Sequence, residues 1–131
     1  MRILIAEDDF ASRKFMLKFL SKFGECDITV DGMEAVDAYL MALDAGTPYD
    51  LVCLDIMMPA LDGYQALKAI RDIEQERKIP EDERAKIIMT TALNEGANVN
   101  KAFDLGCVAY AGKPIDQVKF ESVLRKLELI P

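Results

Sequence analysis

The stretch Ile3-Leu4-Ile5-Ala6-Glu7-Asp8-Asp9 begins with four apolar residues and ends with three acids. A short, continuous apolar run of this kind is typical of a strand that is covered on both faces in a parallel sheet. Three later runs have the same character, namely Leu51–Leu54, Ile87–Met89 and Val108–Ala111. The segment Cys26-Asp27-Ile28-Thr29-Val30 alternates instead, which indicates a half-exposed strand at an edge of the sheet.

The segments between these runs show the three-to-four-residue apolar spacing of amphipathic helices. Two of them start with capping-box spacing, Asp31 with Glu34 and Asp62 with Gln65. Asn94 can cap a fourth helix, which Gly106 would end. Strands that alternate with helices predict an α/β fold, because parallel neighbours need a crossover connection. The polar stretch 74–86 is predicted to be a long surface connection.

The composition is that of a globular protein, and we expect one domain over residues 1–131. The net charge of −7, from 23 acids and 16 bases, disfavours binding to nucleic acid and to anionic membranes. Histidine is absent, which excludes a Ser-His-Asp triad and a histidine-containing zinc site. No apolar run approaches the ~18 residues of a membrane span, and the cysteines form no C-x-x-C pair. Buried thiols in a reducing cytoplasm are the simplest interpretation of Cys26, Cys53 and Cys107.

Polar side chains follow the predicted strands at the point where each strand ends. Ligands of open α/β sheets bind at the carboxyl ends of the strands, so we expect these side chains to converge. Three carboxylates held together repel one another unless a cation relieves the repulsion. With oxygen ligands and no histidine, a hard divalent ion, Mg²⁺ first, is the natural choice. The residues concerned are Glu7, Asp8, Asp55, Thr91 and Lys113.

Several motifs, in order along nearly the whole chain, resemble the receiver domains of two-component response regulators. This resemblance implies a flavodoxin-like, doubly wound sheet of five parallel strands in the order 2-1-3-4-5, with five helices. The motifs are Ile3-Leu4-Ile5-Ala6-Glu7-Asp8-Asp9, Asp31-Gly32-Met33-Glu34-Ala35, Leu54-Asp55-Ile56-Met57-Met58-Pro59 with Asp62-Gly63, Met89-Thr90-Thr91-Ala92, and Tyr110-Ala111-Gly112-Lys113-Pro114.

The resemblance also implies roles for the acids. Asp55 would accept a phosphoryl group and become an aspartyl phosphate. Glu7 and Asp8 would hold Mg²⁺, for which Mn²⁺ could substitute, together with Asp55 and the backbone carbonyl of Met57. Asp8 with Asp9 is an alternative pair of ligands, but Glu7 and Asp8 directly follow the first apolar run and are preferred.

Three further positions match the family's motif. Lys113 would pair with Asp55 and then with a phosphoryl oxygen, and the Lys113–Pro114 bond is commonly cis in the family. Thr91 would hydrogen-bond another phosphoryl oxygen, and Tyr110 would be the aromatic switch residue that turns inward. Phosphorylation would then remodel the surface formed by the fourth helix, fifth strand and fifth helix.

The expected partner is a cytoplasmic sensor histidine kinase or a histidine phosphotransfer protein. Output would pass through an effector protein that the sequence does not identify. The resemblance also implies that the chain could form homodimers on phosphorylation. Direct DNA binding is not expected. The chain would catalyse only its own phosphotransfer and dephosphorylation. Lys14, Lys18 and Lys22 form a solvated face or part of a kinase-docking surface. Met57 and Leu93 are apolar where polar residues can orient a hydrolytic water, which predicts a long-lived phosphorylated state.

Other interpretations fit the sequence less well. A phosphotransferase of the haloacid-dehalogenase type requires a second aspartate two residues after the nucleophile, where this chain has Met57. A flavodoxin-like FMN binder requires a phosphate loop rich in serine, threonine or glycine, where this chain has acids. A degenerate receiver that binds a partner without phosphorylation is disfavoured by the intact site residues. The sequence does not distinguish a stand-alone protein from the receiver of a longer one.

Overall fold

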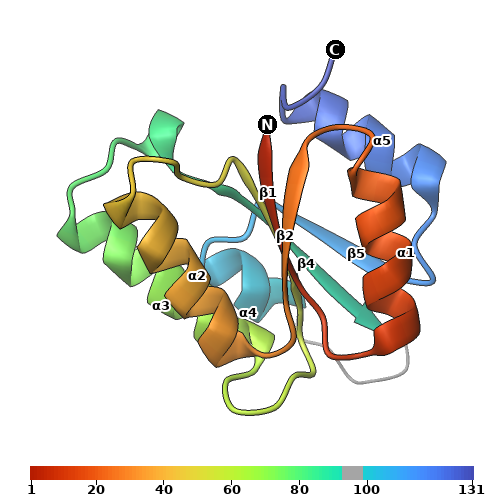
Figure 1. The fold of residues 1–131 in the computed structure, drawn as a ribbon, viewed down its shortest axis with the longest axis horizontal. Coiled ribbons are helices and arrows are strands. Elements are labelled where there is room, and N and C mark those ends of the chain that lie inside the picture. Colours follow the sequence, from red (N-terminus) through yellow and green to blue (C-terminus); the bar gives the residue numbers. More distant parts are fainter. Residues whose placement is uncertain (93–98) are drawn as a thin grey trace.

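The computed structural model describes residues 1–92 and 99–131, and within them the chain forms a five-stranded, all-parallel sheet in the order β2-β1-β3-β4-β5. Helices α1 and α5 cover one face of the sheet, and α2, α3 and α4 cover the other (Figure 1). This arrangement confirms the predicted fold. The elements are β1 Arg2–Ala6, α1 Phe10–Leu20, β2 Glu25–Thr29, α2 Gly32–Asp44, β3 Leu51–Asp55, α3 Gly63–Glu76, the 3₁₀ turn Glu81–Glu83, β4 Lys86–Ala92, α4 Val99–Asp104, β5 Ala109–Lys113 and α5 Gln117–Lys126.

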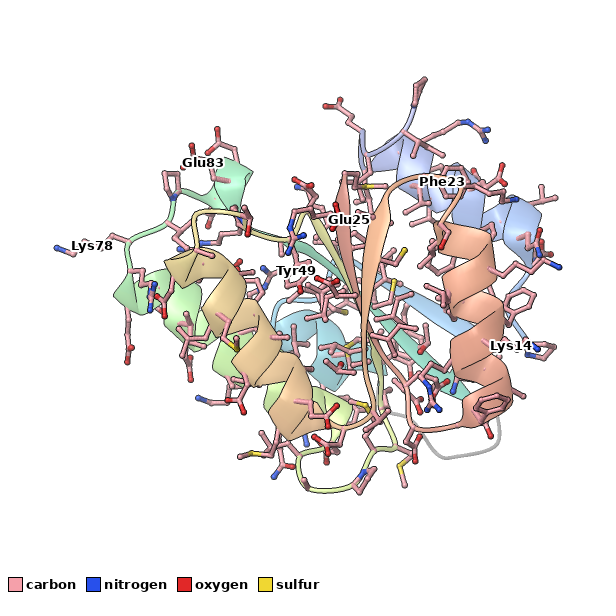
Figure 2. The ribbon with its side chains drawn as sticks, in the orientation of Figure 1. Lys14, Phe23, Glu25, Tyr49, Lys78 and Glu83 are labelled. Carbon is pink, nitrogen blue, oxygen red and sulfur yellow. The ribbon has the colours of Figure 1, made fainter. Side chains whose placement is uncertain are left out.

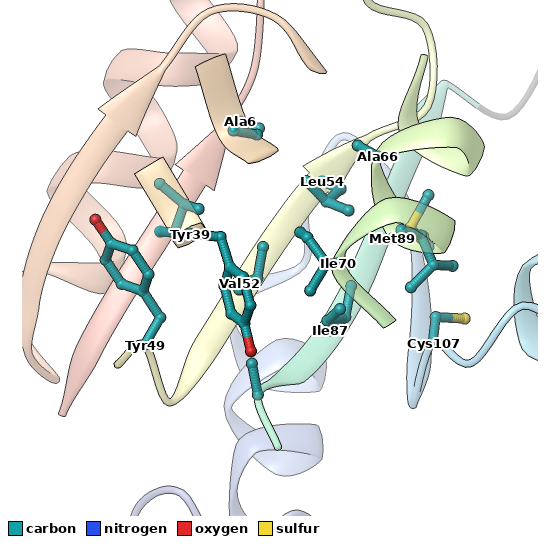
Figure 3. Packing of buried hydrophobic residues seen from close by; sticks show 14 of the residues in the cluster. Ala6, Tyr39, Tyr49, Val52, Leu54, Ala66, Ile70, Ile87, Met89 and Cys107 are labelled. Atoms are coloured by element: carbon teal, nitrogen blue, oxygen red, sulfur yellow. The ribbon is translucent and has the colours of Figure 1, made fainter. Parts of the chain in front are cut away.

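The hydrophobic core has two layers, one on each face of the sheet. Alternate side chains of a strand point to opposite faces, so Val52 and Leu54 pack with α2 and α3, whereas Leu51 and Cys53 pack with α1 and α5. Figure 3 shows the first layer, in which the central strands face Ile70 of α3. All five residues of β3 are buried, as expected for a central strand that is covered on both faces.

The two edge strands differ from the interior ones. β2 lies at one edge, as its alternating sequence predicted. β5 lies at the other edge, and every residue of Ala109–Lys113 is only partly buried. The prediction that Val108–Ala111 is covered like the central strands was therefore wrong, because in the described part of the chain this strand pairs only with β4.

The predicted helix starts are present. Asp62 accepts a hydrogen bond from the backbone N–H of Gln65, whose side chain accepts one from the N–H of Asp62, so this capping box is complete. Asp31 accepts from the N–H of Glu34 at 2.8 Å, but the Glu34 carboxylate accepts from Val30 instead. Both acids at the N-cap satisfy a backbone donor that the helix itself leaves free.

The end of α4 also follows the prediction. Gly106 has a positive φ of 107° just beyond the last helical residue, Asp104, a conformation that favours glycine. Asn94, the predicted cap of this helix, lies outside the described residues.

The stretch 74–86 is not simply a surface connection. Its first three residues continue α3, and Lys86 already belongs to β4. The Glu74 side chain is fully buried and accepts hydrogen bonds from the Tyr39 hydroxyl at 2.6 Å, from Arg71 at 2.7 Å and from the N–H of Ala85 at 3.0 Å. That part of the prediction was wrong, because Arg71 on the same helix and two partners farther away along the chain compensate the burial of this acid.

All three cysteines are free thiols, of which Cys53 and Cys107 are buried and Cys26 is half-buried. Among the described residues, no helix combines the length and apolar character needed to cross a bilayer.

Candidate functional site

The predicted acids meet at the carboxyl end of the central strands. Carboxylate oxygens of Glu7, Asp8 and Asp55 all lie within 4.8 Å of one another. Glu7 and Asp55 are buried, with 2% and 4% of their surface exposed, whereas Asp8 is open to solvent. The sheet register explains the convergence, because Ala6 pairs with Leu54 and the next residue of each strand is one of these acids.

Backbone hydrogen bonds hold both acids in place. The N–H of Glu7 donates to the carbonyl of Thr29 at 3.1 Å, and the N–H of Ile56 donates to that of Thr90 at 3.0 Å. The acidic cluster therefore stands at the ends of two neighbouring strands, β1 and β3, which are bonded here to β2 and β4, so its geometry is set by the sheet.

Lys113, the last residue of β5, is the cation of the site. Its Nζ contacts Glu7 and lies 3.3 Å from the Asp55 carboxylate. Burial, followed by the hydrogen bond and charge of Glu7, raises the pKa of Asp55 to about 8, against the opposing effect of Lys113. Burial lowers the pKa of Lys113, but the two carboxylates outweigh it and the net shift is upward. One lysine thus leaves this cluster with an excess of negative charge.

Asp9 is the N-cap of α1. Its carboxylate accepts from the backbone N–H of Ser12 at 2.9 Å and caps α1, and this hydrogen bond lowers its pKa. Asp9 is not part of the acidic cluster. Sequence reasoning missed Arg13, whose guanidinium donates to the backbone carbonyls of Glu7 and Asp8 at 3.1 and 3.2 Å. Its only sequence signal is its place one turn after these acids.

Thr91 lies within β4, which continues to Ala92, rather than after the strand. It is almost fully buried, and its hydroxyl donates to the carbonyl of Ala92 at 3.2 Å. Tyr110 stands on the neighbouring strand, and its buried hydroxyl makes no close hydrogen bond to another residue of the described ranges 1–92 and 99–131. Burial raises the pKa of Tyr110, and the nearby Thr91 hydroxyl opposes that shift. The two predicted switch residues therefore lie on neighbouring strands, Thr91 one strand away from Asp55 and Tyr110 two strands away.

Two further predicted features, Met57 and the Lys113–Pro114 bond, lie just after the ends of strands β3 and β5. Met57 lies in the loop after Asp55 with 54% of its surface exposed, and the Lys113–Pro114 peptide bond is cis. Leu93 lies outside the described residues.

An apolar cavity of about 260 Å³ opens beside the acidic cluster, between α1 and the loop after β5. Glu7 and Lys113 form its polar side. The rest of its lining is Ala11, Ser12, Phe15, Met16, Thr90, Pro114 and Ile115. A molecule that reaches Asp55 from this side would pass over α1.

A family model described as the response regulator receiver domain matches residues 3–125. The chain is 34% identical over 120 residues to chemotaxis protein CheY of Treponema pallidum, which covers 90% of this chain and 76% of that protein. It is 33% identical over 125 residues to two-component response regulator 24 of Arabidopsis thaliana, which covers 95% of this chain and 81% of that protein.

Other relatives are much longer than this chain. The chain is 31% identical over 127 residues to "Probable histidine kinase 2" of Oryza sativa, but spans only 12% of its length. It spans 7% of "Hybrid signal transduction histidine kinase L" of Dictyostelium discoideum.

Solved structures share the fold. A chain of the CheX-CheY-BeF3-Mg complex from Borrelia burgdorferi superposes with a TM-score of 0.80 at 27% identity, covering 97% of this chain and 89% of that one. A chain of the Saccharomyces cerevisiae complex between the histidine phosphotransfer protein Ypd1 and the receiver domain of Ssk1 has a TM-score of 0.79 at 26% identity, covering 96% and 87%. The receiver domain of sensor histidine kinase PA1611 from Pseudomonas aeruginosa, with magnesium in its active-site cleft, has a TM-score of 0.76 at 26% identity, covering 95% and 94%.

Proposed function

Because the chain belongs to the response regulator receiver family, we propose that Asp55 accepts a phosphoryl group from a phosphohistidine and that the resulting aspartyl phosphate is the signal. The observation that carries this proposal is the cluster itself, with Glu7, Asp8 and Asp55 gathered within 4.8 Å and Lys113 beside them. The donor is a sensor histidine kinase or a histidine phosphotransfer protein of the cytoplasm, and residues 1–131 act as one domain.

Phosphoryl transfer requires mainly that the reacting groups are held in position and that positive charge stabilises the phosphoryl oxygens. A carboxylate oxygen of Asp55 attacks phosphorus, the P–N bond of the phosphohistidine breaks, and its electron pair leaves with the imidazole. Bound Mg²⁺ would favour the ionised form of the Asp55 carboxylate, which has no proton to lose, so no general base would be required. The Nζ of Lys113 lies 3.3 Å from the Asp55 carboxylate. After transfer it can form an ion pair with a phosphoryl oxygen instead. Thr91 would donate its hydroxyl to another of these oxygens.

The donor set of the cluster fits Mg²⁺. It consists of carboxylate oxygens only, which hard divalent ions prefer, and one buried lysine does not neutralise it. Glu7, Asp8, Asp55 and the backbone carbonyl of Met57 would hold the ion, and Mn²⁺ could substitute. When bound, the ion would supply the positive charge that the transferring phosphoryl oxygens require.

The conformational response would run through Thr91 and Tyr110. Movement of the Thr91 hydroxyl toward the phosphoryl group would make room for the ring of Tyr110, whose hydroxyl lies buried near that of Thr91. The surface of α4, β5 and α5 would then change its affinity for an effector protein or for a second copy of the chain. The protein acts as a switch rather than as an enzyme with a substrate of its own.

Helix α1 offers a surface for the phosphodonor. Phe10 and Phe15 expose 69% and 38% of their surface, Phe15 lines the apolar cavity, and Lys14 projects from this helix into solvent (Figure 2). Exposed aromatic side chains next to a reactive site are typical of an interface. We therefore favour the docking interpretation of the face that carries Lys14, Lys18 and Lys22.

The lifetime of the phosphorylated state depends on how well water is oriented at Asp55. The exposed thioether of Met57 offers no strong hydrogen-bond partner to a water molecule. We expect slow autodephosphorylation, and the variant that combines Met57→Asn with Leu93→Glu should shorten the phosphate half-life. An unchanged half-life would refute this part of the proposal.

The proposal is tested by intact mass spectrometry after incubation with acetyl phosphate, with and without Mg²⁺. We expect one added phosphoryl group in the wild-type protein, only when Mg²⁺ is present, and none in Asp55→Asn. No adduct under any condition would mean a receiver fold that binds its partner without phosphorylation.

A further inference from the structure

The first turn of α3 is packed against the backbone of Asp55. The N–H of Gly63 donates to the carbonyl of Ile56 at 2.8 Å. A Cβ atom at Gly63 would lie 2.4 Å from the carbonyl oxygen of Asp55 and 2.7 Å from the Cα of Ile56, so only glycine fits. The start of α3 must therefore follow any shift of the backbone that carries the phosphoacceptor.

Tyr64, the next residue, extends this connection to α4. The Nζ of Lys101 lies 4.7 Å from the centroid of the Tyr64 ring, within the range of a cation–π interaction. Lys101 belongs to the six-residue helix Val99–Asp104. Helices in proteins gain most of their stability from tertiary packing, so the position of these residues depends on contacts such as this one.

Tyr64 also lies beside the aromatic residue of β5. The rings of Tyr64 and Tyr110 pack against the same hydrophobic cluster, which includes Met89 and Ala102. The Tyr110 hydroxyl is buried, and the hydroxyls of Thr91 and Tyr64 lie close enough to it to shift its pKa. Tyr64 is thus placed between Asp55 and two elements of the proposed output surface.

We propose that Tyr64 is a positioning residue that transmits the phosphorylation state of Asp55 to α4 through the contact of its ring with Lys101. This inference rests on the proposed function, because it requires that Asp55 be phosphorylated. Cation–π contacts at exposed sites correspond to about a two- to five-fold change in an equilibrium constant. Loss of the Tyr64–Lys101 contact should weaken the coupling between Asp55 and α4 by this factor.

The experiment measures amide hydrogen exchange of residues 99–104 before and after phosphorylation with acetyl phosphate and Mg²⁺, with intact mass as the measure of phosphorylation. The ratio of exchange rates in the two states reports coupling. A merely structural role would change both rates equally and leave the ratio unaltered. In Tyr64→Leu and Lys101→Met we expect normal phosphorylation and a ratio that moves toward one by about two- to five-fold.

Two variants serve as controls. Tyr64→Phe keeps an aromatic face for Lys101 and should behave as the wild type. Lys68→Met removes an exposed lysine of the same helix, whose partner is Asp72 at 2.8 Å, and should also leave the ratio unchanged. Should Tyr64→Leu fail to fold, Lys101→Met carries the test alone.

Three outcomes would overturn the inference. A wild-type ratio of one, or wild-type ratios in Tyr64→Leu and Lys101→Met, would show that Tyr64 transmits nothing to α4. A defect in Tyr64→Phe equal to that in Tyr64→Leu would place the effect in the hydroxyl rather than the ring. Absence of a phosphoryl adduct in the wild-type protein would instead refute the proposed function, and this inference with it.

Discussion

Two buried carboxylates, Glu74 and Asp55, stand near opposite ends of the sheet and are compensated in opposite ways. Glu74 is fully buried near the amino ends of the strands and has three partners, Tyr39, Arg71 and the N–H of Ala85. Asp55 is 4% exposed at the carboxyl end of β3, where a single lysine is shared with Glu7. Burial removes water from both carboxylates, but only Glu74 has enough hydrogen-bond donors among the described residues to replace it.

This difference separates a structural site from a reactive one. Arg71 also donates to the carbonyls of Ala85 and Gly106, so the Glu74 network ties α2, α3, the start of β4 and the turn before β5 together. A fully satisfied buried network is rigid and has nothing further to bind. The cluster at Asp55 keeps an excess of negative charge, which a cation can relieve and a phosphoryl group can use.

The largest effect is expected at Glu74. Glu74→Ala removes three hydrogen bonds and leaves the half-buried Arg71 guanidinium and the buried Tyr39 hydroxyl without this acid, so the free energy of unfolding should fall by about 3–5 kcal/mol. Urea denaturation followed by circular dichroism measures this loss. Asp72→Ala, which breaks an exposed ion pair on the same helix, should cost less than about 0.5 kcal/mol. Equal losses in the two variants would contradict the comparison.

At the carboxyl end of the sheet, removing the charge of Asp55 should stabilise the protein. Without Mg²⁺, Asp55→Asn should raise the free energy of unfolding by about 2 kcal/mol at pH 8, because it removes like charge beside Glu7 and leaves Lys113 paired with Glu7.

The sign of the pH dependence follows from the raised pKa of Asp55. The folded protein holds the proton up to about pH 8, whereas the unfolded chain releases it near its ordinary value of 3.8. Wild-type stability therefore falls as the pH rises through this window, and the gain in Asp55→Asn should grow from near zero at about pH 4 to its full value near pH 8. Denaturation of both proteins in EDTA across this range measures it. A difference that is constant with pH would show that the charge of Asp55 is not its cause.

A smaller effect is expected from Mg²⁺. At a concentration ten times its Kd, the ion should stabilise the folded protein by about 1.4 kcal/mol, measured as a rise in Tm. Asp8→Asn should abolish this rise. Asp9→Asn is the matched control, because asparagine caps a helix as well as aspartate does and Asp9 is outside the acidic cluster. A rise that depends on Asp9 rather than Asp8 would reverse the assignment of the two acids.

The acidic cluster at Asp55 was more predictable from the sequence than the hydrogen-bond network of Glu74. Asp55, Glu7 and Lys113 each stand at the end of an apolar run, and parallel strands bring such ends together whatever the loops do. Glu74 gave no such signal, because an acid at the start of a polar stretch is ordinarily solvated. Its burial depends on Tyr39, which is 35 residues away, and no local pattern encodes that pairing.

The exposure of the edge strands was also hard to predict from the sequence. Strand β5 has the apolar sequence of an interior strand, yet its residues are half-buried because β4 is its only neighbour within the described chain. Exposure at an edge depends on strand order, which short apolar runs do not contain. The same limit applies to Tyr64, whose contact with Lys101 arises from the packing of α4 on α3.

The most direct test of the central claim is to locate the phosphoryl group by chemistry. An aspartyl phosphate is reduced by borohydride to homoserine, whereas an unmodified carboxylate is not. After phosphorylation with acetyl phosphate and Mg²⁺, reduction and peptide mapping should find homoserine at residue 55 and at no other acid. Homoserine at position 8 or 9, or none at all in a protein that has gained a phosphoryl group, would contradict the assignment of Asp55 as the acceptor.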